Sequence, residues 1–204
     1  MDLVSQAQAS QKGLEDALSS AFLFLVNDYN YKEEPVTYGP SHFQAFTKIF
    51  SLGTRSIEFS GNYDRKLFYD LVFHPINLQA RGELHPSIIY RPHWYFSIYQ
   101  ALNYLDAEVS LPQTGTIEDV ASAFSEVLRS YTIELVEGDF SIFPSIEFVV
   151  SQVLMPDEFR ETLGRFSTIE EAEKCALSKA AALHATSKKR IEIIGQESDA
   201  RGNE

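Results

Sequence analysis

The chain has 204 residues, 44 % of them apolar, and a formal net charge of −12 at pH 7. A surface charged in this way repels nucleic acid and anionic lipid, so we expect neither as a partner. The N-terminus lacks the basic start and long apolar run of a signal peptide, and the apolar residues 21–26 are too few to span a bilayer. The single cysteine, Cys175, rules out an intrachain disulfide and suits a reducing compartment. We therefore expect a cytoplasmic protein.

The first part of the chain predicts a helix followed by strands. Apolar residues recur every three or four positions over residues 11–29, which indicates a buried helix. The pattern then changes to alternation interrupted by short turn signals, which is typical of an antiparallel meander. The predicted strands cover residues 43–50, 55–59 and 67–73, and residues 36–38 could add a short edge strand.

The rest of the chain is predicted to be mostly helical. Residues 74–92 contain three prolines and are interpreted as loop, with residues 87–90 extended. Thr116 and Thr168 are expected N-caps, each followed by acidic residues that suit the helix dipole. Helices are predicted over 94–105, 116–137, 145–154, 156–164 (a short turn) and 168–186, with a strand left open for 145–154 and a short extended piece at 191–194.

Clustered strands, rather than strands alternating with helices, indicate an α+β fold and not an α/β fold. We expect a single domain over residues 1–195, built on a short antiparallel meander of three or four strands. An N-terminal helix and several C-terminal helices would pack against that meander. Residues 196–204 are expected to be a disordered polar tail.

The acidic residues are concentrated in one part of the chain. Between Ala101 and Leu163 there are twelve acidic side chains against two basic ones, Arg129 and Arg160, whereas the first hundred residues hold ten against eight. A local excess of this kind steers association with a basic protein partner. The candidate partner-binding residues on the predicted helix 116–137 and its end are Glu118, Asp119, Glu126, Glu134, Glu137 and Asp139.

No motif predicts a reaction. The chain has no P-loop, GxGxxG, CxxC, HExxH or GxSxG pattern, and no two histidines lie three or four residues apart. We therefore expect no cofactor and no metal site. The pairs Glu118–Asp119, Asp157–Glu158 and Glu170–Glu171 are interpreted as first-turn helix caps, and Asp70 is interpreted as a solvated hairpin charge.

The densest alternative site lies in residues 85–99, which combine histidine, arginine and aromatic residues around two prolines. Such a segment could shape an aromatic pocket of an enzyme, because Trp, Tyr and Arg dominate binding energetics. It could equally anchor the next helix in the core through Trp94. A third hypothesis is a subunit of a larger assembly with its aromatic residues at an interface; the oligomeric state stays open. The alternative pocket residues are His85, Tyr90, Arg91, His93 and Tyr95.

Residues 1–75 also carry a resemblance. The pattern consists of Phe22-Leu23-Phe24-Leu25 through Asp28-Tyr29, then Val36-Thr37-Tyr38, the alternating residues 43–50, and Arg55-Ser56-Ile57-Glu58. It resembles the small α+β immunity proteins of bacterial toxin systems. The resemblance implies a cytoplasmic inhibitor that binds a cognate toxin and has no enzymatic activity. It carries no motif from which functional residues could be transferred.

Overall fold

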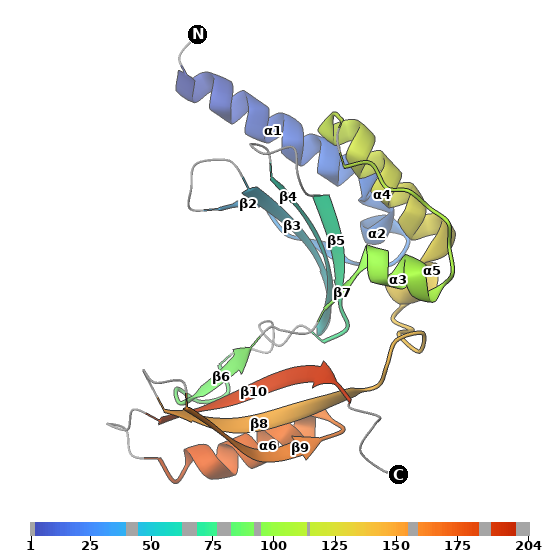
Figure 1. Cartoon of the computed structure of the whole chain (residues 1–204). Helices are drawn as coiled ribbons and strands as arrows, with labels where there is room; N and C mark the ends of the chain where they lie inside the picture. The colour runs from blue at the N-terminus through green and yellow to red at the C-terminus, as the bar shows by residue number, and fades with distance from the viewer. Residues whose placement is uncertain are drawn as a thin grey trace. The chain divides into compact units, whose positions relative to one another are not determined.

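The computed structural model describes the chain in eight stretches and folds it into two compact units of mixed α and β structure (Figure 1). The first unit comprises residues 1–75 and 96–142, and the second comprises residues 76–95 and 143–204. The predicted α+β class is confirmed. The described residues are 3–39, 45–62, 69–76, 83–91, 95–113, 115–154, 159–183 and 189–198.

The first unit contains an antiparallel sheet in the order β1-β3-β4-β5-β7, with β2 pairing to β3. The predicted meander is confirmed as β3, β4 and β5, and the predicted edge strand as β2. Gly53 makes the β3–β4 turn with a φ of +60°, a backbone conformation that glycine adopts without steric cost. The strands are β1 (Lys32–Glu33), β2 (Thr37–Tyr38), β3 (Ala45–Leu52), β4 (Arg55–Asn62), β5 (Tyr69–His74) and β7 (Phe96–Ser97).

Helices cover one face of this sheet (Figure 1). Aromatic side chains fill the space between the two layers: the ring of Phe22 lies 5.4 Å from that of Phe59, which lies 5.2 Å from that of Phe124. Rings of this size bury a large apolar area each, and aliphatic side chains complete the core. The helices are α1 (Leu3–Ala21), α2 (Leu23–Asn27), α3 (Ile98–Tyr104), α4 (Ile117–Tyr131) and α5 (Ile133–Glu137).

Two predicted helices are interrupted. The helix predicted over residues 11–29 starts earlier, as α1, and breaks at Phe22 before the short α2. The helix predicted from Thr116 to Glu137 breaks at Thr132, where the buried hydroxyl donates 3.4 Å to the carbonyl oxygen of Leu128. A buried threonine hydroxyl that bonds back to the previous turn bends a helix. The predicted stop at Gly138 is confirmed by its left-handed φ of +98°.

The second unit is a sheet in the order β6-β10-β8-β9 with one helix on one face. β6 runs parallel to β10, and the other pairs are antiparallel. Ile88, Phe148, Val150, Ile191 and Ile193 pack against the buried side of the helix, which consists of Ile169 and three alanines. The elements are β6 (Ile88–Arg91), β8 (Ile146–Leu154), β9 (Phe159–Phe166), α6 (Ile169–Ala180) and β10 (Lys189–Glu197).

The second unit corrects several predictions. The helix expected over residues 145–154 is strand β8, the alternative that its valine content left open, and the short helical turn at 156–164 is replaced by strand β9. The expected short piece at 191–194 is part of β10, which pairs with β8 over nine residues and includes the first two residues of the expected tail. The helix at residues 94–105 begins only at Ile98. The described part of the chain therefore has two sheets and more than four strands.

No helix among the described residues is long and apolar enough to cross a membrane. Within the same residues, no group of three or more His, Cys, Asp or Glu side chains is arranged to hold a metal ion.

One charged side chain is buried in the first unit. Lys48 on β3 is 1 % exposed, and its Nζ lies 2.6 Å from Oε1 of Glu33 and 3.9 Å from Oε1 of Glu15. Burial raises the pKa of Glu33, but hydrogen bonds from Lys48 and Ser19 outweigh burial and hold that pKa below its ordinary value. The ion pair therefore satisfies a cation that water cannot reach.

We expect Glu33→Gln to cost more than Lys48→Met, although both remove the same ion pair. The first leaves a buried cation facing only Glu15 and should lower the free energy of unfolding by about 2 kcal/mol; the second leaves a carboxylate that is 29 % exposed, so its cost should stay below about 1 kcal/mol. Because the pKa of Glu33 is lowered, the pair stabilises the fold above the ordinary carboxyl pKa, and this contribution is lost as the pH falls through the lowered value. Urea unfolding at neutral and acid pH checks this, and equal costs for the two variants would contradict it.

The sequence predicts one domain over residues 1–195. That the two units unfold together, as one domain would, stays a prediction. We expect calorimetry to show one transition whose measured enthalpy equals the van't Hoff enthalpy. Two resolved transitions would mean that the two units unfold independently.

Candidate functional site

The acidic surface is formed by α4, α5 and the residue after α5. Thr116 caps α4, accepting a 3.2 Å hydrogen bond from the backbone N–H of Asp119. The apolar stripe of α4 is buried, and Ser125 donates 2.6 Å to the carbonyl oxygen of Ala21 at the end of α1. Burial of that stripe leaves the other face of α4 to solvent. All six predicted partner-binding residues are exposed: Glu118, Asp119, Glu126, Glu134, Glu137 and Asp139.

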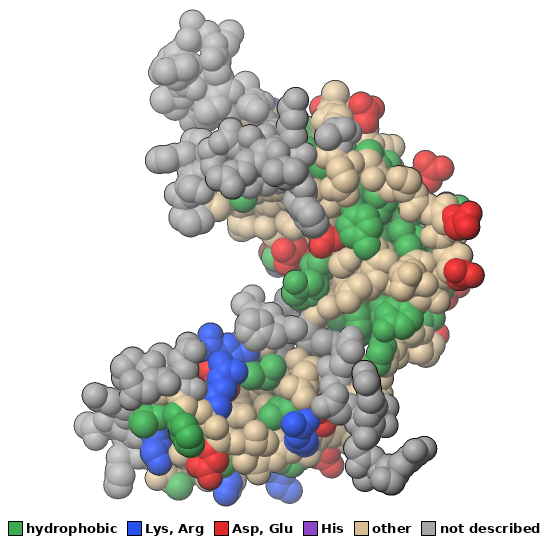
Figure 2. Space-filling model, in the orientation of Figure 1, with side chains coloured by type: hydrophobic (Ala, Val, Ile, Leu, Met, Phe, Trp, Pro, Cys, Tyr) green, Lys and Arg blue, Asp and Glu red, His purple; other side chains and the backbone are tan. Residues whose placement is uncertain are grey.

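These six side chains form no ion pair with any described residue. Asp119 accepts from the hydroxyl of Thr116, and Asp139 accepts from the backbone N–H of Ser141, which lowers the pKa of Asp139. Arg129 is the basic residue of α4, and its guanidinium lies 4.2 Å from the centre of the Phe24 ring. Figure 2 shows acidic side chains along the side of the first unit where Figure 1 places α4. The carboxylates are therefore available to a partner.

A groove borders this surface between α1 and α4. Its volume is about 570 Å³, and Asp16 on α1 and Glu118 on α4 bring carboxylates to it from both helices. The other lining residues are small: Gly13, Ala17, Ser20, Ala21 and Ser122. Small side chains leave room for a long basic side chain between the two carboxylates.

The alternative pocket residues are not brought together. The Nδ1 atom of His85 accepts a 3.1 Å hydrogen bond from the backbone N–H of Ser87. Tyr90 and Arg91 are adjacent on β6 and point to opposite faces of the sheet. Tyr90 donates 2.6 Å to Glu173 on α6, whereas Arg91 bonds to Glu192 on β10. Tyr95 is 50 % exposed, and His93 and Trp94 lie outside the described residues.

Glu192 is a buried carboxylate beside two arginines, and the sequence did not predict it. It is 1 % exposed, its Oε1 accepts a 2.8 Å hydrogen bond from Nε of Arg91, and Nη2 of Arg91 lies 2.7 Å from the same oxygen in an ion pair. Its Oε2 accepts no hydrogen bond from any described residue, and Nη2 of Arg160 lies 3.4 Å away. The alternation of Ile191, Glu192 and Ile193 places the glutamate on the sheet face opposite α6, but the two arginines come from distant strands. Only strand pairing brings these charges together.

A second missed group surrounds Asp70 on β5, which was expected to be a solvated charge. Burial raises the pKa of Asp70 to about 6; the backbone N–H of Leu71 opposes this shift and the charge of Glu58 adds to it. Its buried Oδ1 atom has no hydrogen-bond partner among the residues that the structure describes. Close by, Gln113 donates to the hydroxyl of Tyr99, and burial raises the pKa of that phenol, with the charge of Asp70 adding to the shift. The expectation of a solvated Asp70 is therefore wrong.

Other charged residues lie where the periodicity of their strand or helix places them. Arg55 and Glu58 point to opposite faces of β4: Arg55 donates to the carbonyl oxygen of Glu137, and Glu58 lies 3.5 Å from Nε2 of His74. The pairs Glu118–Asp119 and Glu170–Glu171 occupy the first turns of α4 and α6. The pair Asp157–Glu158 lies outside the described residues.

We expect Asp70→Asn to stabilise the protein at neutral pH. Because the folded pKa of Asp70 is above its ordinary value, stability is full below that ordinary value and falls as the pH rises through about 6. The amide carries no charge to desolvate, so the gain at pH 7 should be about 1 kcal/mol after allowance for partial exposure, and it should disappear towards pH 4. Urea unfolding across this pH range checks it, with the exposed Asp16→Asn as control. A gain that does not vary with pH would contradict the assignment.

The comparisons with known proteins identify no relative. No protein-family model, curated protein or solved structure matches this chain.

Proposed function

We propose that this chain is a non-catalytic binding protein whose acidic surface on α4 and α5 docks on a basic protein. One observation carries the proposal: six carboxylates on one short stretch are exposed and unpaired by any described cation. Surface carboxylates without local cations repel one another, and a basic partner relieves that repulsion. Complementary charge of this kind raises the association rate and excludes acidic partners.

The distribution of charge between the two units supports this location. The first unit holds 17 acidic and seven basic residues, a net charge of −10, whereas the second holds 12 and ten, a net charge of −2. Most of the charge that attracts a basic partner from a distance therefore belongs to the unit that carries α4 and α5. The field of this unit acts over about one Debye length, roughly 8 Å at physiological salt.

The groove between α1 and α4 supports a specific contact rather than attraction alone. A lysine or arginine of the partner could place its alkyl stem against Ala17 and Ala21 and its charge near Asp16 and Glu118. Desolvated contacts of this kind contribute more to affinity than exposed charges at the rim. The groove thus supplies the centre of the proposed interface, and the exposed carboxylates supply its rim.

The resemblance of residues 1–75 to immunity proteins suggests the partner's class. We propose a basic toxin, such as a nuclease, that this chain inhibits in the cytoplasm by covering its basic surface. The enzyme hypothesis at residues 85–99 gains no support from the described geometry, because Tyr90 and Arg91 point to opposite faces of β6.

The test is affinity capture from the native host's lysate at low and high salt. The acidic-surface variant is Glu126→Gln, Glu134→Gln, Glu137→Gln, and the control is Glu83→Gln, Glu108→Gln, Glu161→Gln. Each variant replaces three exposed glutamates with glutamine, so both change the net charge by the same amount. We expect one stoichiometric basic partner that the wild type and the control retain, and that the acidic-surface variant or high salt releases.

A partner held equally by both variants would contradict the acidic surface as the binding site. If the captured partner is toxic when expressed alone, co-expression of the wild type should restore growth, and co-expression of the acidic-surface variant should restore less. A partner whose toxicity is unaffected by the wild type would contradict inhibition while leaving the binding site supported.

A further inference from the structure

The outer edge of β9 is open. β9 is the last strand of its sheet, and β8 is its only strand neighbour in the part of the chain that the structure describes. Most of its eight residues are exposed or half-buried, and Phe159 is 67 % exposed. Backbone N–H and C=O groups along such an edge can pair with an added extended segment.

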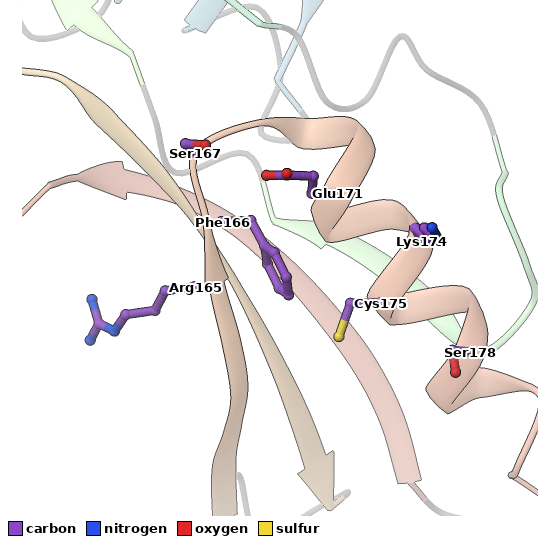
Figure 3. A pocket seen from close by; sticks show the side chains of 7 residues that line it. All are labelled: Arg165, Phe166, Ser167, Glu171, Lys174, Cys175 and Ser178. Atoms are coloured by element: carbon purple, nitrogen blue, oxygen red, sulfur yellow. The ribbon is translucent and has the colours of Figure 1, made fainter.

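A groove runs beside this edge. It lies between β9 and α6 and has a volume of about 580 Å³ (Figure 3). Its lining residues are Arg165, Phe166 and Ser167 at the end of β9, and Glu171, Lys174, Cys175 and Ser178 on one flank of α6. Figure 3 shows the Phe166 ring and the Cys175 sulfur on the groove side of β9, with Arg165 pointing the other way. Phe166 and Cys175 therefore offer apolar contacts to side chains that enter from an added strand, and the rest of the lining is polar.

The two faces of the β9 edge differ in charge. A bulge opposite Val150 and Ser151 puts Arg160 and Arg165 on the same face, where they pair with Val153 and Val149 of β8. Arg160 lies near Glu192, and Arg165 binds Glu147. Each guanidinium has five N–H donors, and the two arginine side chains are 44 % and 52 % exposed, so the described contacts leave donors for another carboxylate.

A second copy of β9 fits this edge poorly. In the antiparallel register that aligns two copies over their full length, Phe159 lies opposite Phe166 and Arg160 lies opposite Arg165. Like charges directly opposite one another destabilise a strand pair. An incoming strand with carboxylates at these positions would instead place opposite charges together.

We propose that β9 and its groove bind an extended segment of a partner protein in which acidic and apolar side chains alternate. The segment adds to the sheet as a fifth strand, because its backbone pairs with β9. Its side chains point alternately to the two faces, so the acidic ones meet Arg160 and Arg165 and the apolar ones meet Phe166 and Cys175. This site differs in place and in charge preference from the acidic surface of the first unit, and neither proposal depends on the other.

Cys175 provides the readout, because it is the only cysteine of the chain and it lines the groove. The probes are two capped eight-residue peptides, one alternating Glu with Val and the other Lys with Val. We expect the Glu–Val peptide, at ten times its dissociation constant, to slow modification of Cys175 by a thiol reagent about ten-fold. The Lys–Val peptide should leave the rate unchanged. In amide NMR spectra of the full chain, the Glu–Val peptide should shift signals of β9 and α6.

The matched variants are Arg165→Glu and Lys179→Glu. Both reverse one exposed positive charge in the second unit, but Lys179 does not line the groove. We expect Arg165→Glu to weaken binding of the Glu–Val peptide about ten-fold, since attraction becomes repulsion at one cross-strand position. Lys179→Glu should bind as the wild type does. Circular dichroism of both variants confirms that they fold.

Each of several outcomes would overturn the proposal. Equal protection of Cys175 by both peptides would show that charge does not select the segment. If neither peptide protects Cys175 and the NMR signals of β9 do not shift, the edge binds neither peptide. Equal loss of binding in the two variants would show a general charge effect. Dimerisation of the chain in sedimentation experiments that buries Cys175 would assign the edge to a second copy.

Discussion

The second unit depends on the insertion of β10 between β6 and β8. β10 pairs with β8 over nine residues and with β6 over four, and it brings Ile191 and Ile193 under α6. Without it, β6 would have no described strand neighbour, and the apolar face of α6 would lose the centre of the sheet it covers. The pairing of β10 with β6 joins segments about a hundred residues apart, as Ile88 and Ile191 are. The entropy cost of closing so long a loop must be overcome before these contacts form. The last strand of the chain thus completes a unit that begins near residue 76.

Each unit buries a charged side chain beside partners of opposite charge. Lys48 lies in the first unit with Glu33 and Glu15 around it, and Glu192 lies in the second unit with two arginines. In both cases an ion of opposite charge offsets part of the desolvation cost. Without that ion, the buried group would lose its charge or would remain exposed to water. Asp70 has no such cation among the described residues, and burial raises its pKa instead. A carboxylate that is buried beside a cation and one that is buried without a described cation therefore change the pH dependence of stability in opposite directions.

The surfaces proposed for binding follow from how each unit buries its apolar residues. The apolar face of α4 is buried in the core, and its carboxylates remain exposed to water. The result is an acidic surface along a helix. The second unit covers one sheet face with α6 but leaves the edge of β9 open beside it. Electrostatic attraction governs the first proposed interface, whereas backbone pairing governs the second. One chain could in this way bind two partners of opposite charge.

Local patterns in the sequence determined the α+β class, the meander of the first unit and the cap at Thr116, because period, turn residues and capping act over a few positions. They also determined the exposure of the acidic residues on α4, since the spacing of the apolar stripe defines the other face. Only the tertiary structure decided that residues 146–154 and 159–166 form strands, since a valine-rich segment such as 146–154 suits helix or strand until a partner strand is present. It alone brought Glu192 to Arg91 and Arg160 and buried Asp70, because those neighbours come from distant segments that no local pattern connects.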